Sequence, residues 1–283
     1  MNVLSIQSQV VYGHVGNSAA AFVLQRQGHA VWQVPTVLFS NHLGKPSYRG
    51  RAVPADQAQD MIEGLKELGY LDHVDMLLTG YLGTAETARL AAELAGIIRA
   101  QKPNAIFACD PVMGDDDALY VKPDLADTIA TDLVPIANVL LPNIFELARL
   151  TGRTIKDATG ALEAAHALQQ SSGVRVLVAT GIPADRSDRI AALALEGGKV
   201  HRAEAPRRKL RVAGTGDTFT ALFTGHYVRD RDAAGALRFA MQAMDTICAA
   251  TEKADADELL IVQTQGDWAS PEVGSRKSEV GLE

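Results

Sequence analysis

The sequence predicts an α/β protein in which helices cover both faces of a mostly parallel sheet. Short apolar runs rich in Val, Ile and Leu alternate with longer segments of helical period, as in repeated strand–helix–strand units. The 283 residues, 47% of them hydrophobic, can build one large domain with a substantial core, and no long linker divides them. We therefore expect three layers, with the sheet between two layers of helices.

The elements follow in order along the chain. The predicted strands are Val3–Gln7, Ala30–Val37, Met76–Thr79, Ala105–Cys109, Val139–Leu141, Val174–Ala179 and Ile190–Leu195. The predicted helices are Ser18–Gln27, Ala55–Leu68, Ala85–Ala100, Leu125–Leu133, Ala158–Gln170, Asp217–Val228 and Ala233–Ala250. One further strand, Lys199–Ala205, is joined to Ile190–Leu195 through Gly197-Gly198, which predicts an antiparallel hairpin at the edge of the sheet.

The domain is expected to span residues 1–265. From residue 266 the sequence turns polar, so we expect 266–283 to form a poorly packed tail. The two cysteines, Cys109 and Cys248, are far apart and fit neither a disulfide framework nor a zinc site. Neither a signal peptide nor a membrane span is recognisable, and we expect a cytoplasmic protein without a membrane partner.

The formal net charge of -7 argues against a protein that binds nucleic acid in general, because such a surface needs excess Lys and Arg. The basic run Arg207-Arg208-Lys209-Leu210-Arg211 is therefore a local feature. A solvated loop is its simplest interpretation, but the glycine turn that follows it suggests an anion site.

That turn is Gly214-Thr215-Gly216-Asp217, at the start of a predicted helix. Two glycines let backbone N–H groups face an anion at the positive end of a helix, and an aspartate beside them can meet a hydroxyl proton. This combination indicates phosphoryl transfer to an alcohol. The same four residues also occur as an ordinary turn and N-cap, so the motif alone leaves both interpretations open.

Ligands of open α/β sheets bind beyond the carboxyl ends of the strands, so the residues that follow each predicted strand matter most. The first strand leads to Ser8 and a glycine-containing loop. In order, these segments read Gln7-Ser8-Gln9-Val10-Val11-Tyr12-Gly13-His14-Val15-Gly16-Asn17-Ser18, Phe39-Ser40-Asn41-His42, Gly80-Tyr81-Leu82-Gly83, Cys109-Asp110-Pro111-Val112-Met113-Gly114 and Pro142-Asn143-Ile144-Phe145-Glu146.

With these segments in this order, the chain resembles the pyridoxal kinases, vitamin B6 salvage enzymes of the ribokinase-like superfamily. The resemblance covers nearly the whole chain before the tail. It implies a ribokinase-like three-layer α/β/α fold, ATP as co-substrate, Mg²⁺ as cofactor, pyridoxal as the small-molecule substrate and a homodimer.

The resemblance also implies roles for the residues at the phosphoryl-transfer end. Gly214, Thr215 and Gly216 would present backbone N–H groups to the phosphoryl oxygens. Asp217 would orient the attacking hydroxyl and take its proton late. The sequence has no Walker A motif, and the family instead places Asp110 and Glu146 at Mg²⁺. Glu146 can equally close a capping box with Asn143, and the two roles are compatible.

The remaining implied contacts divide between the two ligands. Residues expected at ATP are Asp110, Leu141, Glu146, Thr180, Arg207, Arg208 and Lys209, the last three on a lid that closes over the triphosphate. Residues expected at pyridoxal are Ser8, Phe39, His42, Tyr81 and Asp217. His14 and His42 are open between ligand contact and a structural role. Leu43-Gly44 replaces polar residues that the family often carries after His42, so a polar substrate contact is expected to be missing.

Three alternatives remain at this point. A hydroxymethylpyrimidine kinase would share the fold and the Gly-x-Gly-Asp turn, but the N-terminus lacks the glycine-rich segment expected there. A sugar kinase would need more carboxylate and amide groups near the first strand. A non-catalytic vitamin B6 binding protein would not need Asp217, Asp110 and Glu146 together.

Overall fold

The computed structural model describes residues 1–115 and 118–269. In this part of the chain, nine strands form one sheet in the order β11-β10-β9-β8-β5-β4-β1-β2-β3, and β6 and β7 form a small separate ladder. The strands are β1 (Asn2–Tyr12), β2 (Ala30–Asn41), β3 (Gly50–Ala52), β4 (Met76–Thr79), β5 (Ile106–Cys109), β6 (Gly114–Asp115), β7 (Ala118–Leu119), β8 (Val139–Leu140), β9 (Val176–Pro183), β10 (Arg189–Glu196) and β11 (Lys199–Pro206).

The centre of the sheet is parallel and its edges are antiparallel. β2, β1, β4, β5, β8 and β9 pair in parallel, and the β10–β11 hairpin, with Glu196 opposite Lys199, closes one edge. At the other edge β3 pairs antiparallel with β2. The mostly parallel α/β fold with an antiparallel edge hairpin is therefore confirmed, and β3 is an element that the sequence analysis missed.

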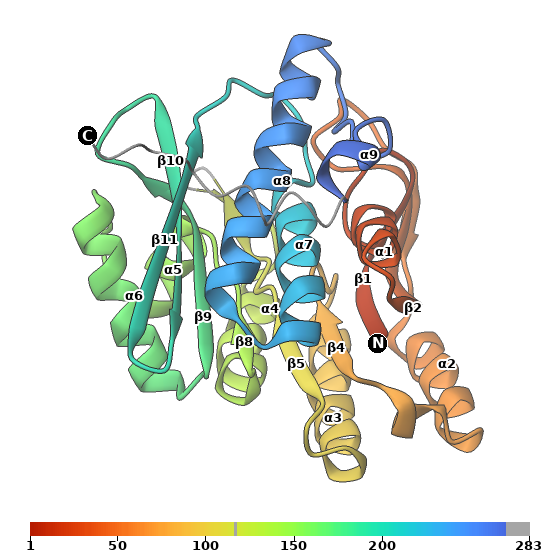
Figure 1. Cartoon of the computed structure of the whole chain (residues 1–283). Coiled ribbons are helices and arrows are strands. Elements are labelled where there is room, and N and C mark those ends of the chain that lie inside the picture. The colour runs from red at the N-terminus through yellow and green to blue at the C-terminus, as the bar shows by residue number, and fades with distance from the viewer. Residues whose placement is uncertain (116–117, 270–283) are drawn as a thin grey trace.

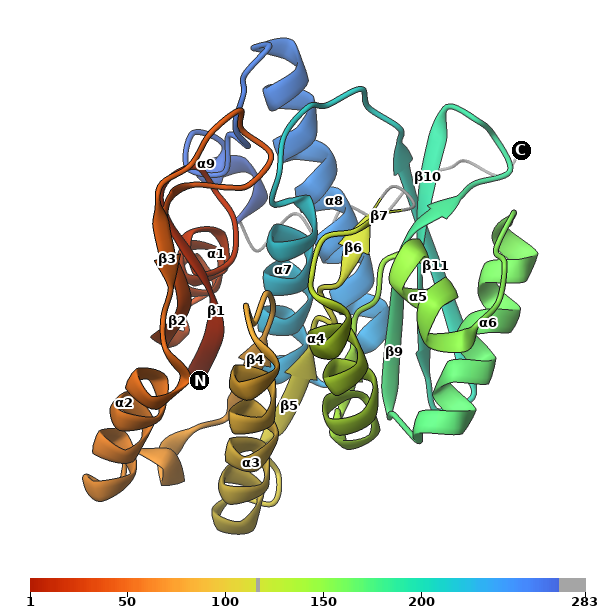
Figure 2. The same cartoon turned by 180° about the vertical axis from the view of Figure 1, so that it is seen from behind.

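The helices lie in two layers, one on each face of the sheet, as comparison of Figure 1 and Figure 2 shows. α1, α7 and α8 cover one face, and α2, α3, α4 and α6 cover the other. The helices are α1 (Asn17–Arg26), α2 (Ala55–Glu67), α3 (Ala85–Gln101), α4 (Pro123–Thr128), α5 (Ile144–Thr151), α6 (Ala158–Ser172), α7 (Thr215–Asp230), α8 (Ala233–Lys253) and α9 (Gln265–Trp268), with short turns η1 (Tyr70–His73), η2 (Ile129–Leu133) and η3 (Val134–Ile136).

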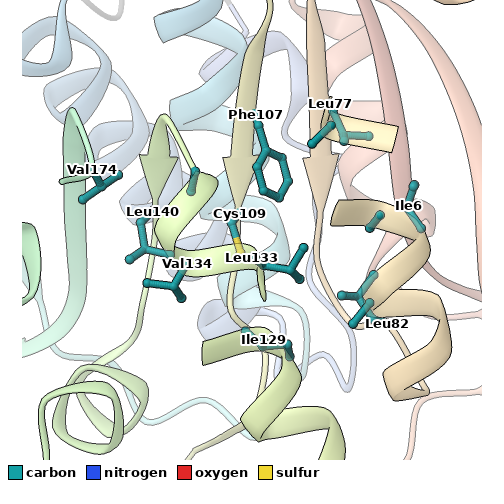
Figure 3. Packing of buried hydrophobic residues seen from close by; sticks show 14 of the residues in the cluster. Ile6, Leu77, Leu82, Phe107, Cys109, Ile129, Leu133, Val134, Leu140 and Val174 are labelled. Carbon is teal, nitrogen blue, oxygen red and sulfur yellow. The ribbon is translucent and has the colours of Figure 1, made fainter. Parts of the chain in front are cut away.

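Each face of the sheet buries its own apolar core. Figure 3 shows the core under α3 and α4, where Cys109 at the end of β5 lies among Phe107, Leu133 and Leu140. Burial raises the pKa of the Cys109 thiol to about 12, so this cysteine behaves as a small apolar residue rather than a nucleophile. Aromatic side chains of α7 fill the opposite core, where Phe223 and Tyr227 stack with ring centroids 5.9 Å apart.

Two expectations need correction. The predicted helix Leu125–Leu133 is α-helical only as far as Thr128, where α4 ends, and Ile129–Leu133 form the wider turn η2, whose hydrogen bonds span five residues instead of four. The expected poorly packed tail does not begin at residue 266: Trp268 is fully buried, and its indole N–H donates to the Ile261 carbonyl at 2.9 Å. The remainder of the expected tail, 270–283, lies outside the described residues.

None of the helices in the described ranges combines the length and the apolar character that a bilayer crossing needs.

Candidate active site

A cavity of about 480 Å³ lies beyond the carboxyl ends of β1, β4, β5 and β8. This volume is typical of cavities that bind small molecules. Twelve of the residues predicted for the site line it: Ser8, Phe39, His42, Tyr81, Asp110, Leu141, Glu146, Thr180, Gly214, Thr215, Gly216 and Asp217. The fold thus brings together side chains from most of the length of the chain.

One wall of the cavity is the start of α7. The helix begins at Thr215, two residues earlier than expected, so the glycine turn supplies its first turn. Gly214 precedes it with φ of +85°, a left-handed conformation that favours glycine, and no side chain caps the helix. The N–H groups of a first helical turn have no partner within the helix and lie at the positive end of the helix dipole. The wall is therefore suited to bind phosphate oxygens.

Asp217 lies in this first turn and lines the cavity. Its carboxylate accepts a hydrogen bond from the backbone N–H of Gly16, in the loop between β1 and α1. Burial raises the pKa of Asp217 above its ordinary value, and the Gly16 hydrogen bond opposes this shift. A carboxylate with a raised pKa is a better proton acceptor than one in water, which suits a base for a hydroxyl.

Two further acids lie on the same cavity. Asp110 follows β5 and accepts a hydrogen bond from the Thr220 hydroxyl at 2.8 Å. Burial, and then the charge of Asp217, raise the pKa of Asp110 to about 8. Burial, and then the charge of Asp110, raise the pKa of Glu146 as well. Asp110 is thus close enough to Asp217 and to Glu146 for their charges to interact, and acids this close favour a bound cation.

Glu146 also has the structural role that the sequence left open. Its carboxylate accepts the N–H of Asn143 at 2.9 Å, and the Asn143 side chain accepts the N–H of Glu146 at 2.9 Å, which completes a capping box on α5. The other carboxylate oxygen accepts the Met113 N–H at 2.9 Å. Glu146 is therefore held rigidly, with its position fixed from both α5 and the segment after β5.

These acids are better suited to Mg²⁺ than to a metal ion whose ligands all come from the protein. Residues 1–115 and 118–269 contain no group of three or more His, Cys, Asp or Glu side chains arranged to hold a metal. Mg²⁺ keeps several waters and takes one or two carboxylates from a protein, with phosphates completing its shell. Asp110 and Glu146 fit this pattern.

Another part of the cavity, which we call the apolar end, is lined by aromatic and apolar side chains. Ser8 lies where β1 shifts register against β2, between the pairs Gln7–Pro35 and Gln9–Leu38. Such irregularities re-aim side chains next to binding sites. Phe39 and Tyr81 provide aromatic surface, and the Phe39 ring is supported by Tyr48 at a centroid distance of 4.9 Å. This end is suited to a planar ring with a polar edge.

The basic run does not line the cavity in this structure. The first lining residue in this part of the chain is Val212, just after the run. Arg208 instead binds α8, with its guanidinium 2.7 Å from Asp245 and 3.0 Å from Glu252. The Lys209 N–H also donates to Glu252, at 3.3 Å. Contact of Arg207, Arg208 and Lys209 with ATP stays a prediction.

Several lining residues were missed. Thr220 stands three residues after Asp217 on α7, so helical spacing carried a signal for it. Tyr120, after β7, has its hydroxyl pKa raised by burial and then by the nearby Glu146 and Asp217. No local pattern marks Tyr120, because only the fold brings the short β6–β7 ladder over the cavity.

Comparison with known proteins shows the family of the chain. The phosphomethylpyrimidine kinase family model matches residues 55–257. Pyridoxal kinase PdxY of Corynebacterium diphtheriae is 42% identical over 96% of this chain and 96% of its own. The enzyme of the same name from Leifsonia xyli is 38% identical over 99% of this chain and all of its own.

A solved structure of pyridoxal kinase from Leishmania donovani in complex with ADP and pyridoxamine superposes with a TM-score of 0.88 at 32% identity, covering 95% of this chain and 96% of that one. A putative phosphomethylpyrimidine kinase from Bacteroides thetaiotaomicron, 24% identical, shares the fold with a TM-score of 0.87 over 95% of this chain and 94% of its own. By its sequence and its ribokinase-like fold, this chain belongs to the pyridoxal kinase family.

Proposed function

We propose that this enzyme transfers the γ-phosphoryl group of ATP to the 5′-hydroxymethyl group of pyridoxal, forming pyridoxal 5′-phosphate. The observation that carries the proposal is one cavity that is lined both by a helix N-terminus with Asp217 and by Ser8, Phe39 and Tyr81. A planar pyridine bound at the apolar end would direct its hydroxymethyl group toward Asp217. ADP and pyridoxamine in the Leishmania donovani relative support both halves of this assignment.

In this proposal the protein contributes mainly position and charge. Backbone N–H groups of Gly214, Thr215 and Gly216 would hold the phosphoryl oxygens, and Asp217 would orient the hydroxyl and accept its proton. Leu141 and Thr180 would lie beside ATP. Asp110 and Glu146 would hold Mg²⁺, which when bound neutralises charge on the phosphates.

We also propose that the lid residues Arg207, Arg208 and Lys209 approach the triphosphate when ATP binds. Arg208 would then exchange its partners on α8, Asp245 and Glu252, for phosphate. Such an exchange is feasible because ion pairs of this exposure are worth only about 1 kcal/mol or less.

We also propose a homodimer, because the resemblance to the pyridoxal kinases implies one. Val11 and Leu38 near the ends of β1 and β2 expose 91% and 50% of their surface, which a partner subunit would cover. Light scattering coupled to size-exclusion chromatography measures the assembly directly.

The test is ADP release with ATP and Mg²⁺, measured with pyridoxal, pyridoxine, pyridoxamine, hydroxymethylpyrimidine and ribose. We expect turnover on pyridoxal, and a loss of about 10²- to 10⁴-fold in kcat for Asp217→Asn with the KM for pyridoxal little changed. Tight binding of pyridoxal without turnover would contradict the proposal.

A second candidate is a hydroxymethylpyrimidine kinase, because the matching family model is that of phosphomethylpyrimidine kinase. The same experiment distinguishes the two: a kcat/KM higher for the pyrimidine than for pyridoxal would assign the enzyme to that activity instead.

A further inference from the structure

An acid from the far end of the chain reaches the substrate end of the cavity. Glu258 lies in the segment between α8 and α9, which Figures 1 and 2 both show beside the loop that joins β2 to β3. It is only 8% exposed. A buried carboxylate is costly unless it is paired and hydrogen-bonded, so its partners show what it is held for.

Those partners come from two loops of the site. The Nε2 atom of His42 lies 3.1 Å from Glu258 Oε1, and Lys45 Nζ lies 2.9 Å from the same oxygen. The backbone N–H of His14 donates to the other oxygen, Oε2, at 3.3 Å. We call Glu258, His42, Lys45 and the His14 N–H the Glu258 clamp.

The hydrogen bonds of His42 define its tautomer. Its Nδ1 atom accepts the backbone N–H of Gly44 at 3.2 Å. A backbone N–H can only donate, so Nδ1 carries no proton, and the hydrogen must be on Nε2, which donates to Glu258. Glu258 therefore orients the ring, and through it the turn His42-Leu43-Gly44, whose three residues all line the cavity.

The second arm of the clamp reaches the phosphoryl-transfer end. Glu258 packs onto Gly13, where a Cβ would stand 2.7 Å from Oε2, and holds the loop that continues through His14 to Gly16. The carbonyl of His14 packs against Gly214, and the Gly16 N–H donates to Asp217. One carboxylate thus links the turn over the apolar end to the loop that supports Asp217.

Glu258 itself is anchored in the core. Leu259 and Ile261, which follow it, are fully buried, and the Leu260 N–H donates to the Thr251 hydroxyl on α8 at 3.1 Å. The neighbouring Asp257 also binds Lys45, at 2.9 Å, but its side chain is 70% exposed and its other hydrogen bond is to the Tyr12 hydroxyl.

We infer that Glu258 is a positioning residue for the substrate: it holds His42 as the Nε2–H tautomer and fixes the 42–44 turn over the bound ring. The inference rests on the proposed function, since it assigns the apolar end of the cavity to pyridoxal. Neither the resemblance nor the local sequence marks this acid.

The decisive variant is Glu258→Gln, with Asp257→Asn as its matched control. A side-chain amide has a single acceptor oxygen, so the variant cannot accept from His42 and from the His14 N–H on two separate oxygens as the carboxylate does. We expect Glu258→Gln to raise the KM for pyridoxal about 10-fold while the KM for ATP changes less than about twofold, because the 42–44 turn loses its anchor whereas the His14 loop keeps its packing against Gly214. Asp257→Asn should leave both values within about twofold of wild type.

A KM for pyridoxal that stays at the wild-type value in Glu258→Gln would overturn the inference, as would an equal rise in Asp257→Asn or an equal rise in the KM for ATP. A second readout does not depend on turnover. The ¹⁵N shifts of the imidazole nitrogens should show His42 as the Nε2–H tautomer in wild type and a mixed or altered state in Glu258→Gln.

A His42 that is the Nδ1–H tautomer in wild type would refute the clamp. Absence of pyridoxal turnover in wild type would refute the proposed function, and the ¹⁵N shifts would still decide whether Glu258 fixes His42.

Discussion

The carbonyl oxygen of His14 packs directly against Gly214, where it occupies the space that a Cβ would need. The loop after β1 and the turn before α7 are therefore in direct backbone contact. This contact fixes the distance between the Gly16 N–H, which holds Asp217, and the N–H groups of the glycine turn. The same backbone contact therefore positions both Asp217 and the glycine turn.

We predict that Gly214→Ala destabilises the protein by at least about 2 kcal/mol, because the new methyl group would overlap the His14 carbonyl and because φ is positive. Gly216→Ala is the matched control: nothing among the described residues lies within 4 Å of its Cβ position. Thermal unfolding measures both variants. Equal melting temperatures for the two would show that the contact with His14 is not tight.

Asp110→Asn should raise the Mg²⁺ concentration needed for half-maximal rate by about 10-fold or more, since one of two carboxylates available to the ion is lost. The measurement is a Mg²⁺ titration of ADP release at saturating substrate. Asp124→Asn, on the outer first turn of α4, serves as the control. An unchanged Mg²⁺ requirement in Asp110→Asn would exclude Asp110 from the metal site.

The buried His29 predicts a pH dependence of stability. Its Nε2 atom donates to the Gly225 carbonyl at 2.9 Å, and burial lowers the pKa of His29 below its ordinary value of about 6.5. The folded state then binds fewer protons than the unfolded state. The contribution of His29 to the free energy of unfolding is therefore present above about pH 6.5 and is lost as the pH falls below that value.

Denaturant unfolding at pH 7 and pH 5 should therefore show that acid lowers the free energy of unfolding less in His29→Gln than in wild type. His166→Gln, on the exposed face of α6, should keep the wild-type loss. An equal decrease in the free energy of unfolding of the two variants between pH 7 and pH 5 would contradict the prediction.

Trp268→Ala should cost about 3–5 kcal/mol of unfolding free energy, as for other large buried side chains. The ring is fully buried, and it meets Phe22 of α1 edge-on at a centroid distance of 6.4 Å. Val262→Ala, at a position that is 38% exposed, should cost less than about 1 kcal/mol. Similar midpoints for both variants in denaturant would show that Trp268 does not hold its segment in place.

The parts of the fold and site that the sequence predicts are those with a local signal. Met76–Thr79 is a short, mainly apolar run between Asp75 and Gly80, and it forms β4 with the expected bounds. Tyr81 and Asp110 each follow such a run, so their place at the carboxyl edge of the sheet follows from the parallel topology alone. Ser8 instead lies within β1, which continues beyond its predicted end at Gln7 to Tyr12.

The parts that escaped prediction depend on partners distant in the chain. Glu258 meets His42 across 216 residues, and Arg208 meets Asp245 across 37. A basic run shows its own charge but not the acids that bind it, which is why Arg208 was expected at the cavity. Trp268 stands in a polar stretch, and its contacts with Phe22 of α1 and with the Ile261 carbonyl show that it belongs to the core.

The sheet order places β1, the first strand of the chain, between β4 and β2, and the loop that follows β1 lies against the turn that precedes α7. Ser8 and Asp217 therefore come together only after most of the chain has been synthesised and ordered. Loops of this length close slowly, so catalytic competence should be among the last properties recovered on refolding. Secondary structure should return first, and ligand binding should lag behind it.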